Sequence, residues 1–307
     1  MNIRLASRGS ALALTQSRMI AAALEKAHKG LRVEIVEIKT SGDVKLGQSL
    51  QAIGGKGAFT KELEDALLEK RADLAVHSLK DLPTTMPDGL TIGCTPPRED
   101  VADVLLLRQH QPLNELTEDP FHLLSAKAVL GSSSLRRRAQ ALMHRRDLKI
   151  IEFRGNVDTR LRKLEEGKAD ACLLALAGLK RLGLMPSLDQ RFGVFILPPE
   201  KWLPAVSQGC LGIECRADDK ATLKLLQPLH DEATFACVSA ERAFLHALGA
   251  GCTAPVGAHA LVAQGMITLK GALFAEDGSA ATRGQSSGPI QDAVKLGEQA
   301  ARGLSRT

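Results

Sequence analysis

The sequence predicts an α/β fold with mainly parallel sheets, followed by a small C-terminal α+β domain. Over the first two-thirds of the 307 residues, short apolar runs alternate with amphipathic stretches, as in successive βαβ units. Two proline pairs, Pro96-Pro97 and Pro198-Pro199, bracket the second half of that alternation. From residue 218 the pattern changes to helical spacing and then to a β-meander. A chain of this length also exceeds what one hydrophobic core usually organises.

The elements of the first two-thirds follow from their periodicity. We expect strands over Asn2–Ser7, Leu31–Thr40, Leu74–Leu79, Val104–Leu107, Ala128–Leu130, Lys149–Phe153 and Ala171–Ala175. Amphipathic helices are expected from the end of the first strand to about Lys26 and over Phe59–Lys70, and helical stretches separate the later strands.

The C-terminal region has its own pattern. Asp218–Leu248 is predicted to be largely helical, Val256–Phe274 alternates around Gly265 like a meander, and Ala293–Leu304 is predicted to be a closing helix. Gln285–Gly288 is predicted to be a polar loop.

The proline pairs suggest how the domains are divided. A segment bounded by two such breaks is typical of a domain inserted into another through a two-strand hinge. We therefore expect domain 1 over residues 1–97 and 199–217, domain 2 over 98–198, and the C-terminal domain over 218–307.

Composition excludes several classes of protein. No apolar run approaches the roughly 18 residues that a membrane span needs. Aromatic residues make up 3% of the chain, with no Tyr, which argues against stacking of nucleic-acid bases. The six cysteines form no CxxC pair and no zinc-like cluster with histidine, so we expect reduced thiols and no metal. The first 24 residues lack acids and faintly resemble a transit peptide, but their strand-then-helix pattern favours a mature, cytoplasmic protein.

Positive charge is concentrated in one segment. Ser132–Lys163 holds ten basic residues against three acidic ones, a net charge of +7, so the rest of the chain sums to −2. A solvated helix face is the simpler interpretation for four of them: Arg145, Arg146, Arg162 and Lys163. Arg136, Arg137 and Arg154 instead follow strand ends, where free N–H groups and a helix dipole favour anion binding.

Three further places carry candidate chemistry. Lys80-Asp81 follows a buried strand, so Asp81 is expected near a site and not in an ordinary surface turn. Gly54–Gly57 is a weak anion-binding or lid signal. Cys252 lies in a glycine-flanked loop that would present its thiol to an open site, and both a functional and a structural role remain open for it. Cys94, Cys172, Cys215 and Cys237 are predicted to be core residues, and Cys210 is ambiguous.

Eight motifs in order resemble the porphobilinogen deaminase (hydroxymethylbilane synthase) family. They are RLASRGSALA, GGKGAFTKELE, AVHSLKDLPT, GSSSLRRRAQ, RGNVDTRLRKL, LAGLKRLG, LPAVSQG and GAGCTAPVG. The resemblance implies two domains like type II periplasmic binding proteins, with a cleft between them, and a third domain. It implies head-to-tail condensation of four porphobilinogen molecules into linear hydroxymethylbilane, with release of ammonia, in tetrapyrrole and haem biosynthesis.

The resemblance also implies roles for individual residues. A dipyrromethane cofactor, made of two linked pyrroles, is attached to the cysteine that matches Cys252, and the catalytic aspartate matches Asp81. The other positions matched to cofactor contacts are Lys80, Ser133, Arg136 and Arg137. Those matched to substrate contacts are Arg8, Gln16, Lys56, Ser134, Arg154, Arg160 and Arg181.

The partners implied are porphobilinogen, the growing polypyrrole and the next enzyme of tetrapyrrole synthesis, with a monomeric chain. The sequence departs from the family pattern at four positions: Ser207 and Cys210 stand where Gly and Ala are frequent, Ala52 where some members have Lys, and Ser132 where Thr is common. The alternatives are a non-catalytic binding module of the same fold and a nucleic-acid binder that uses the arginines.

Overall fold

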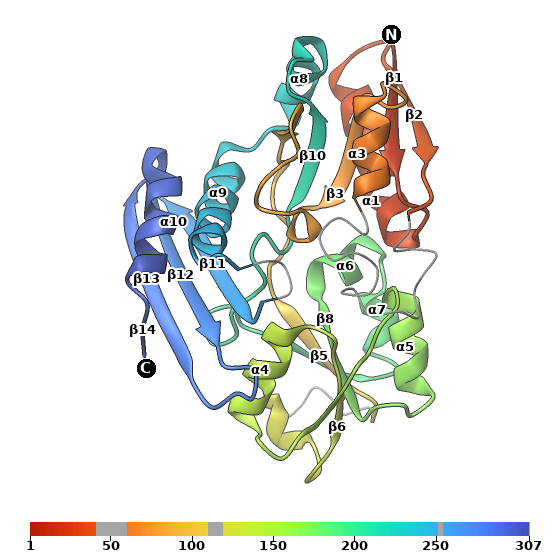
Figure 1. The fold of residues 1–307 in the computed structure, drawn as a ribbon. Coiled ribbons are helices and arrows are strands. Elements are labelled where there is room, and N and C mark those ends of the chain that lie inside the picture. The colour runs from red at the N-terminus through yellow and green to blue at the C-terminus, as the bar shows by residue number, and fades with distance from the viewer. Residues whose placement is uncertain (41–59, 110–118, 251–253, 307) are drawn as a thin grey trace. The chain divides into compact units, whose positions relative to one another are not determined.

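The computed structural model describes residues 1–40, 60–109, 119–250 and 254–306 (Figure 1). These residues belong to two compact units, which we call unit 1 and unit 2. Unit 1 comprises Met1–Glu99 and Cys210–Phe235, and unit 2 comprises Asp100–Gly209 and Ala236–Thr307. No helix of the described residues is long and apolar enough to cross a membrane.

Unit 1 is built on a five-stranded sheet with the order β2-β1-β3-β10-β4. Its strands are β1 (Asn2–Ser7), β2 (Arg32–Glu37), β3 (Leu74–Ser78), β4 (Leu90–Cys94) and β10 (Leu211–Arg216). β1, β2 and β3 are parallel, and β10 lies antiparallel between β3 and β4. Four strands therefore run in one direction and β10 in the other.

The period of two in these strands sends alternate side chains to opposite faces of the sheet. Ile3 and Leu5 pack with Leu24 of α1 (Ala11–Ala27) and with α8 (Lys220–Leu226). Ala6 and Ala75 face α3 (Lys61–Leu68) on the other side. The short helices η1 (Leu79–Asp81) and η3 (Gln227–Leu229) also belong to this unit.

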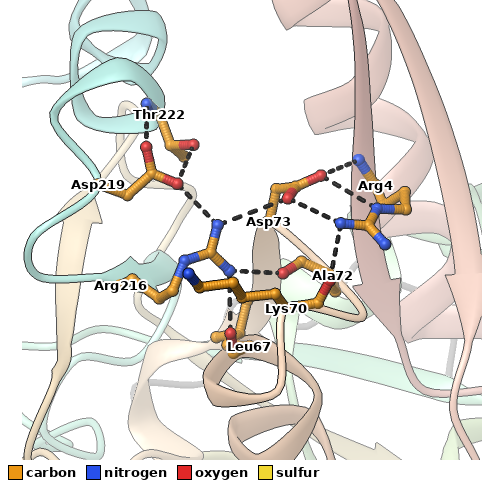
Figure 2. A network of polar contacts seen from close by, with 8 residues as sticks. All are labelled: Arg4, Leu67, Lys70, Ala72, Asp73, Arg216, Asp219 and Thr222. Atoms are coloured by element: carbon orange, nitrogen blue, oxygen red, sulfur yellow. Dashed lines mark hydrogen bonds and ion pairs between the residues drawn. The ribbon is translucent and has the colours of Figure 1, made fainter.

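Arginines and aspartates form a network of hydrogen bonds and ion pairs at one edge of this sheet (Figure 2). Asp73 accepts hydrogen bonds from Arg4, whose backbone N lies 2.8 Å away and whose Nη2 lies 3.1 Å away. Nη2 of Arg216 lies 3.5 Å from Asp73 and 2.7 Å from Asp219, which caps α8. Arg216 also donates to the carbonyls of Leu67 and Ala72. We call Arg4, Asp73, Arg216 and Asp219 the Asp73 cluster; it lies where β3 begins and the antiparallel β10 ends.

Unit 2 contains a second five-stranded sheet with the order β7-β6-β8-β5-β9. Its strands are β5 (Asp103–Leu107), β6 (Val129–Gly131), β7 (Lys149–Ile151), β8 (Ala171–Ala175) and β9 (Gly193–Leu197). β6, β7 and β8 are parallel, while β5 runs antiparallel to β8 and β9. The helical segments are η2 (Pro120–Leu123), α4 (Leu135–His144), α5 (Val157–Glu165), α6 (Leu176–Arg181) and α7 (Met185–Leu188).

The C-terminal part of the chain forms an antiparallel sheet with the order β11-β12-β13-β14. Its elements are α9 (Glu232–Ala247), β11 (Val256–Ala263), β12 (Met266–Phe274), β13 (Ala281–Pro289), η4 (Ile290–Asp292), α10 (Ala293–Arg302) and β14 (Ser305–Arg306). Phe244 and Leu296 from the helices pack against Ile267 and Leu269 of β12. Gly271 allows the closest approach, because a Cβ there would meet the ring of Phe244.

The predicted fold class is confirmed, since each five-stranded sheet has four strands in one direction and one antiparallel strand. The loop predicted over Gln285–Gly288 is wrong, because these residues lie in β13 and pair with β12. Small residues suit this strand because α10 packs closely on it: a Cβ on Gly288 would lie 3.1 Å from Leu296, and Ser286 donates to the carbonyl of Leu296. The three-domain division stays a prediction.

Candidate functional site

Candidate residues of unit 1 lie at the ends of two neighbouring parallel strands. Arg8 follows β1, and Lys80 and Asp81 form η1 directly after β3. Because β1 and β3 are parallel neighbours, these residues share one edge of the sheet, which we call the carboxyl edge. Asp81 is exposed, while Arg8 and Lys80 are half-buried.

Several polar side chains form hydrogen bonds next to the carboxyl edge. Gln16 of α1 is buried, and its Nε2 donates to Oγ of Ser78 at 3.1 Å. Ser17 donates to Ser7 at 2.8 Å, and Ser7 donates to the carbonyl of Arg8 at 3.0 Å. Gln16 therefore fixes the residue at the end of β3, three positions before Asp81. Sequence reasoning missed Ser78, although a polar residue that closes a buried strand was a usable signal.

Unit 2 gathers the larger set of candidates at its own carboxyl edge. β6, β7 and β8 are parallel neighbours and are followed, respectively, by α4, by α5 and by α6. The residues brought to this edge are Ser133, Ser134, Arg136, Arg137, Arg154 and Arg160, whereas Arg181 is the last residue of α6.

Serine hydroxyls shape the turn between β6 and α4. Ser134 is the N-cap of α4, and its hydroxyl accepts from the backbone N of Arg137. Ser133 accepts from the backbone N of Phe153 at 2.9 Å, and Ser132 accepts from the backbone N of Ser134 at 3.3 Å. The turn and the next strand end are thereby held together at the positive end of the α4 dipole.

Arg136 and Arg137 are buried and converge on one carboxylate. Nη2 of Arg136 lies 2.8 Å from Oδ2 of Asp103, and Nη2 of Arg137 lies 2.6 Å from Oδ1. Nη1 of Arg136 donates to the carbonyl of Leu203, and Nη1 of Arg137 donates to that of Leu173. Nε of each arginine is buried and has no hydrogen-bond partner among the described residues.

Asp103 also accepts hydrogen bonds from two neutral side chains. Nε1 of Trp202 lies 2.9 Å from Oδ2, and Nε2 of Gln208 lies 2.8 Å from Oδ1. Burial alone would raise the pKa of Asp103, but the two arginines and these hydrogen bonds hold it well below its usual range. We call Asp103, Arg136, Arg137, Trp202 and Gln208 the Asp103 cluster.

The remaining arginines have other partners. Arg154 forms an ion pair with exposed Glu152 at 2.9 Å, and Arg181 donates to the carbonyl of Gly209 at 2.7 Å. Arg160 is half-buried in α5. Arg145, predicted to lie on a solvated helix face, instead binds Asp147 and three backbone carbonyls, so that prediction is wrong for this residue and its role is structural.

Comparisons with known proteins decide the family. Residues 3–224 match the family model "Porphobilinogen deaminase, dipyromethane cofactor binding domain", and residues 235–305 match "Porphobilinogen deaminase, C-terminal domain". This chain belongs to the porphobilinogen deaminase family. A porphobilinogen deaminase from Paracoccus denitrificans is 46% identical over 305 residues, covering 98% of this chain and 93% of that protein. One from Syntrophotalea carbinolica is 43% identical, covering 98% and 92%.

Solved structures are more distant. Full-length BenM has a TM-score of 0.42 at 17% identity, covering 74% of this chain and 67% of that chain. The VFT2 domain of BvgS from Bordetella pertussis has a TM-score of 0.44 at 16% identity, covering 73% and 84%. Neither supports a functional assignment.

The cofactor of the porphobilinogen deaminase family is a dipyrromethane whose rings carry carboxylates, and the Asp103 cluster fits such a group. The cluster buries two guanidinium cations against one carboxylate, which leaves a surplus of one positive charge. Burial and the like charge of Arg137 lower the pKa of Arg136, and Asp103 only partly offsets them. A buried unpaired charge is costly, so the cluster favours an added anion.

Cys252, Lys56 and Ala52 lie outside the described residues. The five described cysteines are buried. Burial raises the pKa of Cys94 and of Cys172 to about 12 and that of Cys215 to about 11, so these thiols stay protonated. The core role predicted for Cys94, Cys172, Cys215 and Cys237 is confirmed. Within the described ranges no group of His, Cys, Asp or Glu side chains could hold a metal ion.

The departure from the family pattern at Ser207 has a structural consequence. Its φ is 61°, in the left-handed region that glycine adopts without strain. Its backbone N donates to Glu241 at 2.7 Å, and its buried hydroxyl has no hydrogen-bond partner in the part of the chain that is described. A glycine at this position would avoid both costs.

Proposed function

We propose that this chain condenses four porphobilinogen molecules head to tail into linear hydroxymethylbilane and releases ammonia at each step. One observation carries the proposal: in a chain that matches the family's cofactor-binding domain, Arg136, Arg137, Arg154 and Arg160 lie at one sheet edge. A growing chain of acetate- and propionate-bearing pyrroles accumulates carboxylates, and arginine is the side chain best suited to bind them in pairs.

The residues matched to the family motifs are proposed to have two kinds of role, cofactor binding and substrate binding. Lys80, Ser133, Arg136 and Arg137 are proposed to hold the cofactor. Those proposed to hold substrate are Arg8, Gln16, Lys56, Ser134, Arg154, Arg160 and Arg181. When bound, the dipyrromethane supplies the pyrrole carbon that attacks each incoming substrate.

Asp81 is the proposed catalytic residue. Loss of ammonia leaves positive charge on the substrate pyrrole, and a carboxylate beside the pyrrole nitrogen stabilises that charge. At 4 Å the attraction is worth about 1 kcal/mol in water and about 4 kcal/mol at an effective dielectric constant of 20, so exclusion of water by substrate strengthens it. Asp81 lies in η1, three residues after Ser78, whose hydroxyl accepts a hydrogen bond from Gln16, and this position suits the role.

Cys252 is the proposed attachment point. Its Sγ–C bond forms as the C–N bond of the porphobilinogen aminomethyl group breaks, and ammonia leaves with the thiol proton. The burial of the five described cysteines supports this assignment, because a buried neutral thiol is a poor nucleophile.

The wider setting is also proposed. The chain is a cytoplasmic monomer whose product passes to the next tetrapyrrole enzyme. Its domains follow the division 1–97 with 199–217, 98–198, and 218–307. The four parallel strands follow the same order in both five-stranded sheets, with the antiparallel strand in the same place, and this supports two domains of the same kind.

Intact mass under denaturing, reducing conditions tests the function. After incubation with porphobilinogen, the wild-type chain should be heavier than its sequence by two deaminated porphobilinogen units, and Cys252→Ser should keep the bare mass. Wild-type protein that stays bare after incubation would refute the proposal. A Cys252→Ser chain that gains the mass would move the attachment to another residue.

A further inference from the structure

The carboxylate of the Asp103 cluster lies at a particular place in the sheet, among the arginines of the proposed anion site. Asp103 is the first residue of β5, the strand that runs against β6, β7 and β8. It is therefore paired with Ala175, the last residue of β8, and lies at the carboxyl edge among the ends of the parallel strands. It is fully buried and has four donors: two guanidinium groups, the Trp202 indole and the Gln208 amide.

Asp103 occupies only some of the hydrogen-bond donors of Arg136 and Arg137 and neutralises only part of their charge. Each guanidinium donates through one Nη to Asp103 and through the other Nη to a backbone carbonyl. The Nε–H groups are left over in the described structure, and one positive charge is not balanced. Both guanidinium groups are thus fixed in orientation while their charge is only half neutralised.

We infer that Asp103 is a positioning residue for cofactor assembly: it holds Arg136 and Arg137 side by side so that together they bind a pyrrole carboxylate. The inference rests on the proposed function and extends it to a residue that does not touch the ligand. Gln208 connects the same carboxylate to the segment with which the chain enters unit 2, because its Nε2 also donates to the carbonyl of Val101 at 2.8 Å.

Electrostatics alone would make the opposite prediction. Asp103 is an anion, so removing its charge would strengthen carboxylate binding if charge were all that mattered. A positioning role predicts weaker binding after the same change, because two buried guanidinium groups without a shared acceptor repel each other and separate. The sign of the effect therefore distinguishes the two roles.

The experiment measures covalent loading of cofactor-free, full-length protein by porphobilinogen, followed by intact mass. Asp103→Asn should raise the porphobilinogen concentration for half-maximal loading by about tenfold or more, the loss expected when charge-assisted hydrogen bonds are misaligned. Asp103→Glu keeps the charge but moves the carboxylate, and should load at a concentration between those of wild type and Asp103→Asn.

Asp73→Asn is the matched control, because Asp73 also lies between two arginines, at the opposite edge of the sheet of unit 1. It should load within about twofold of wild type, since neither Asp73 nor its arginines belongs to the proposed site. Unchanged or tighter loading of Asp103→Asn would overturn the inference. If that variant does not fold, a folded Asp103→Glu that loads like wild type would overturn it.

Trp202 supplies a second readout that does not depend on turnover. It is the only tryptophan of the chain, and its indole N–H donates to Asp103. Loading should change its fluorescence emission, because a carboxylate on Arg136 and Arg137 redistributes the charge around Asp103. Wild-type protein that loads without any change in emission would also contradict the inference, whereas wild-type protein that does not load would refute the proposed function itself.

Discussion

In both five-stranded sheets the antiparallel strand is the fourth across the sheet, yet the two sheets use an aspartate between two arginines in different ways. The Asp73 cluster of unit 1 contains Arg4 and Arg216 against Asp73 and Asp219, so its charges balance. Among the described residues, the Asp103 cluster of unit 2 contains Arg136 and Arg137 against one acidic residue, Asp103. The comparison suggests that a balanced cluster joins elements, whereas a buried cluster with surplus charge is prepared for a ligand.

Position and exposure agree with this distinction. The Asp73 side chain is 20% exposed and lies at the edge where β3 begins, away from η1 and Asp81. The Asp103 side chain is 0% exposed and lies at the carboxyl edge. The antiparallel strand explains the difference, because β10 ends at the Asp73 cluster, whereas β5 begins with Asp103 at the edge where its parallel neighbours end.

The largest effect that would test the comparison is expected from Arg137→Leu. This change gives the Asp103 cluster one cation and one anion, the balance found in unit 1. The porphobilinogen concentration for half-maximal loading should rise by about tenfold to a hundredfold, because one of two charged donors is lost.

Arg216→Leu is its counterpart in unit 1. It removes a cation from the Asp73 cluster, so it should lower the thermal transition without changing the loading concentration. Equal loading by Arg137→Leu and wild type would show that surplus charge does not distinguish the clusters.

The sequence predicted the parts of the site that are contiguous along the chain. Arg136, Arg137 and Arg154 follow strand ends within short motifs, and Asp81 directly follows β3. Asp103 was not predicted, because its partners Arg137, Trp202 and Gln208 are 34, 99 and 105 positions away. An aspartate that opens an apolar strand also fits a surface turn, and only the pairing of β5 with β8 shows that it is buried.

The same limit applies to the fold. Alternation along the chain predicted strands such as Leu74–Leu79, which the structure confirms as β3. β4, β9 and β10 were missed, and alternation within a segment cannot show that β10 inserts between β3 and β4. That pairing joins segments more than one hundred residues apart, so it depends on tertiary packing and not on local periodicity.

A smaller effect is expected from Asp73→Asn, which tests the joining role of unit 1. Burial would raise the pKa of Asp73, but hydrogen bonds from Arg4 and the charges of Arg4 and Arg216 hold that pKa below its ordinary value. A carboxyl group with a depressed pKa stabilises the folded state above its unfolded pKa, and this contribution disappears as the pH falls through the folded pKa.

Asp73→Asn should therefore be less stable than wild type by about 1–2 kcal/mol near neutral pH, as for a partly buried charged hydrogen bond. The difference should shrink below about pH 4. Chemical denaturation of both proteins at several pH values measures it. A difference that does not change from neutral to acid pH would mean that the charge of Asp73 does not stabilise unit 1.

The smallest expected effect is that of Ser207→Gly, next to Gln208 of the Asp103 cluster. A left-handed φ of 61° costs a non-glycine residue about 1–2 kcal/mol of folding stability, which glycine would recover. Glycine also increases the entropy of the unfolded chain, and this offsets about 0.5–1 kcal/mol of the gain. Removal of a buried hydroxyl without a partner adds to the gain, so we expect stabilisation of about 1 kcal/mol and a thermal transition higher by about 2 °C.

Gln264→Gly separates the two causes, because Gln264 has a φ of 51° but an exposed side chain. If the buried hydroxyl matters, Ser207→Gly should raise the thermal transition more than Gln264→Gly does. Equal shifts would assign the whole effect to backbone strain. If Ser207→Gly is more stable but its loading by porphobilinogen is unchanged, the backbone strain next to Gln208 is not needed to hold Asp103. The hydrogen bonds to Asp103 are then sufficient to keep Arg136 and Arg137 in place.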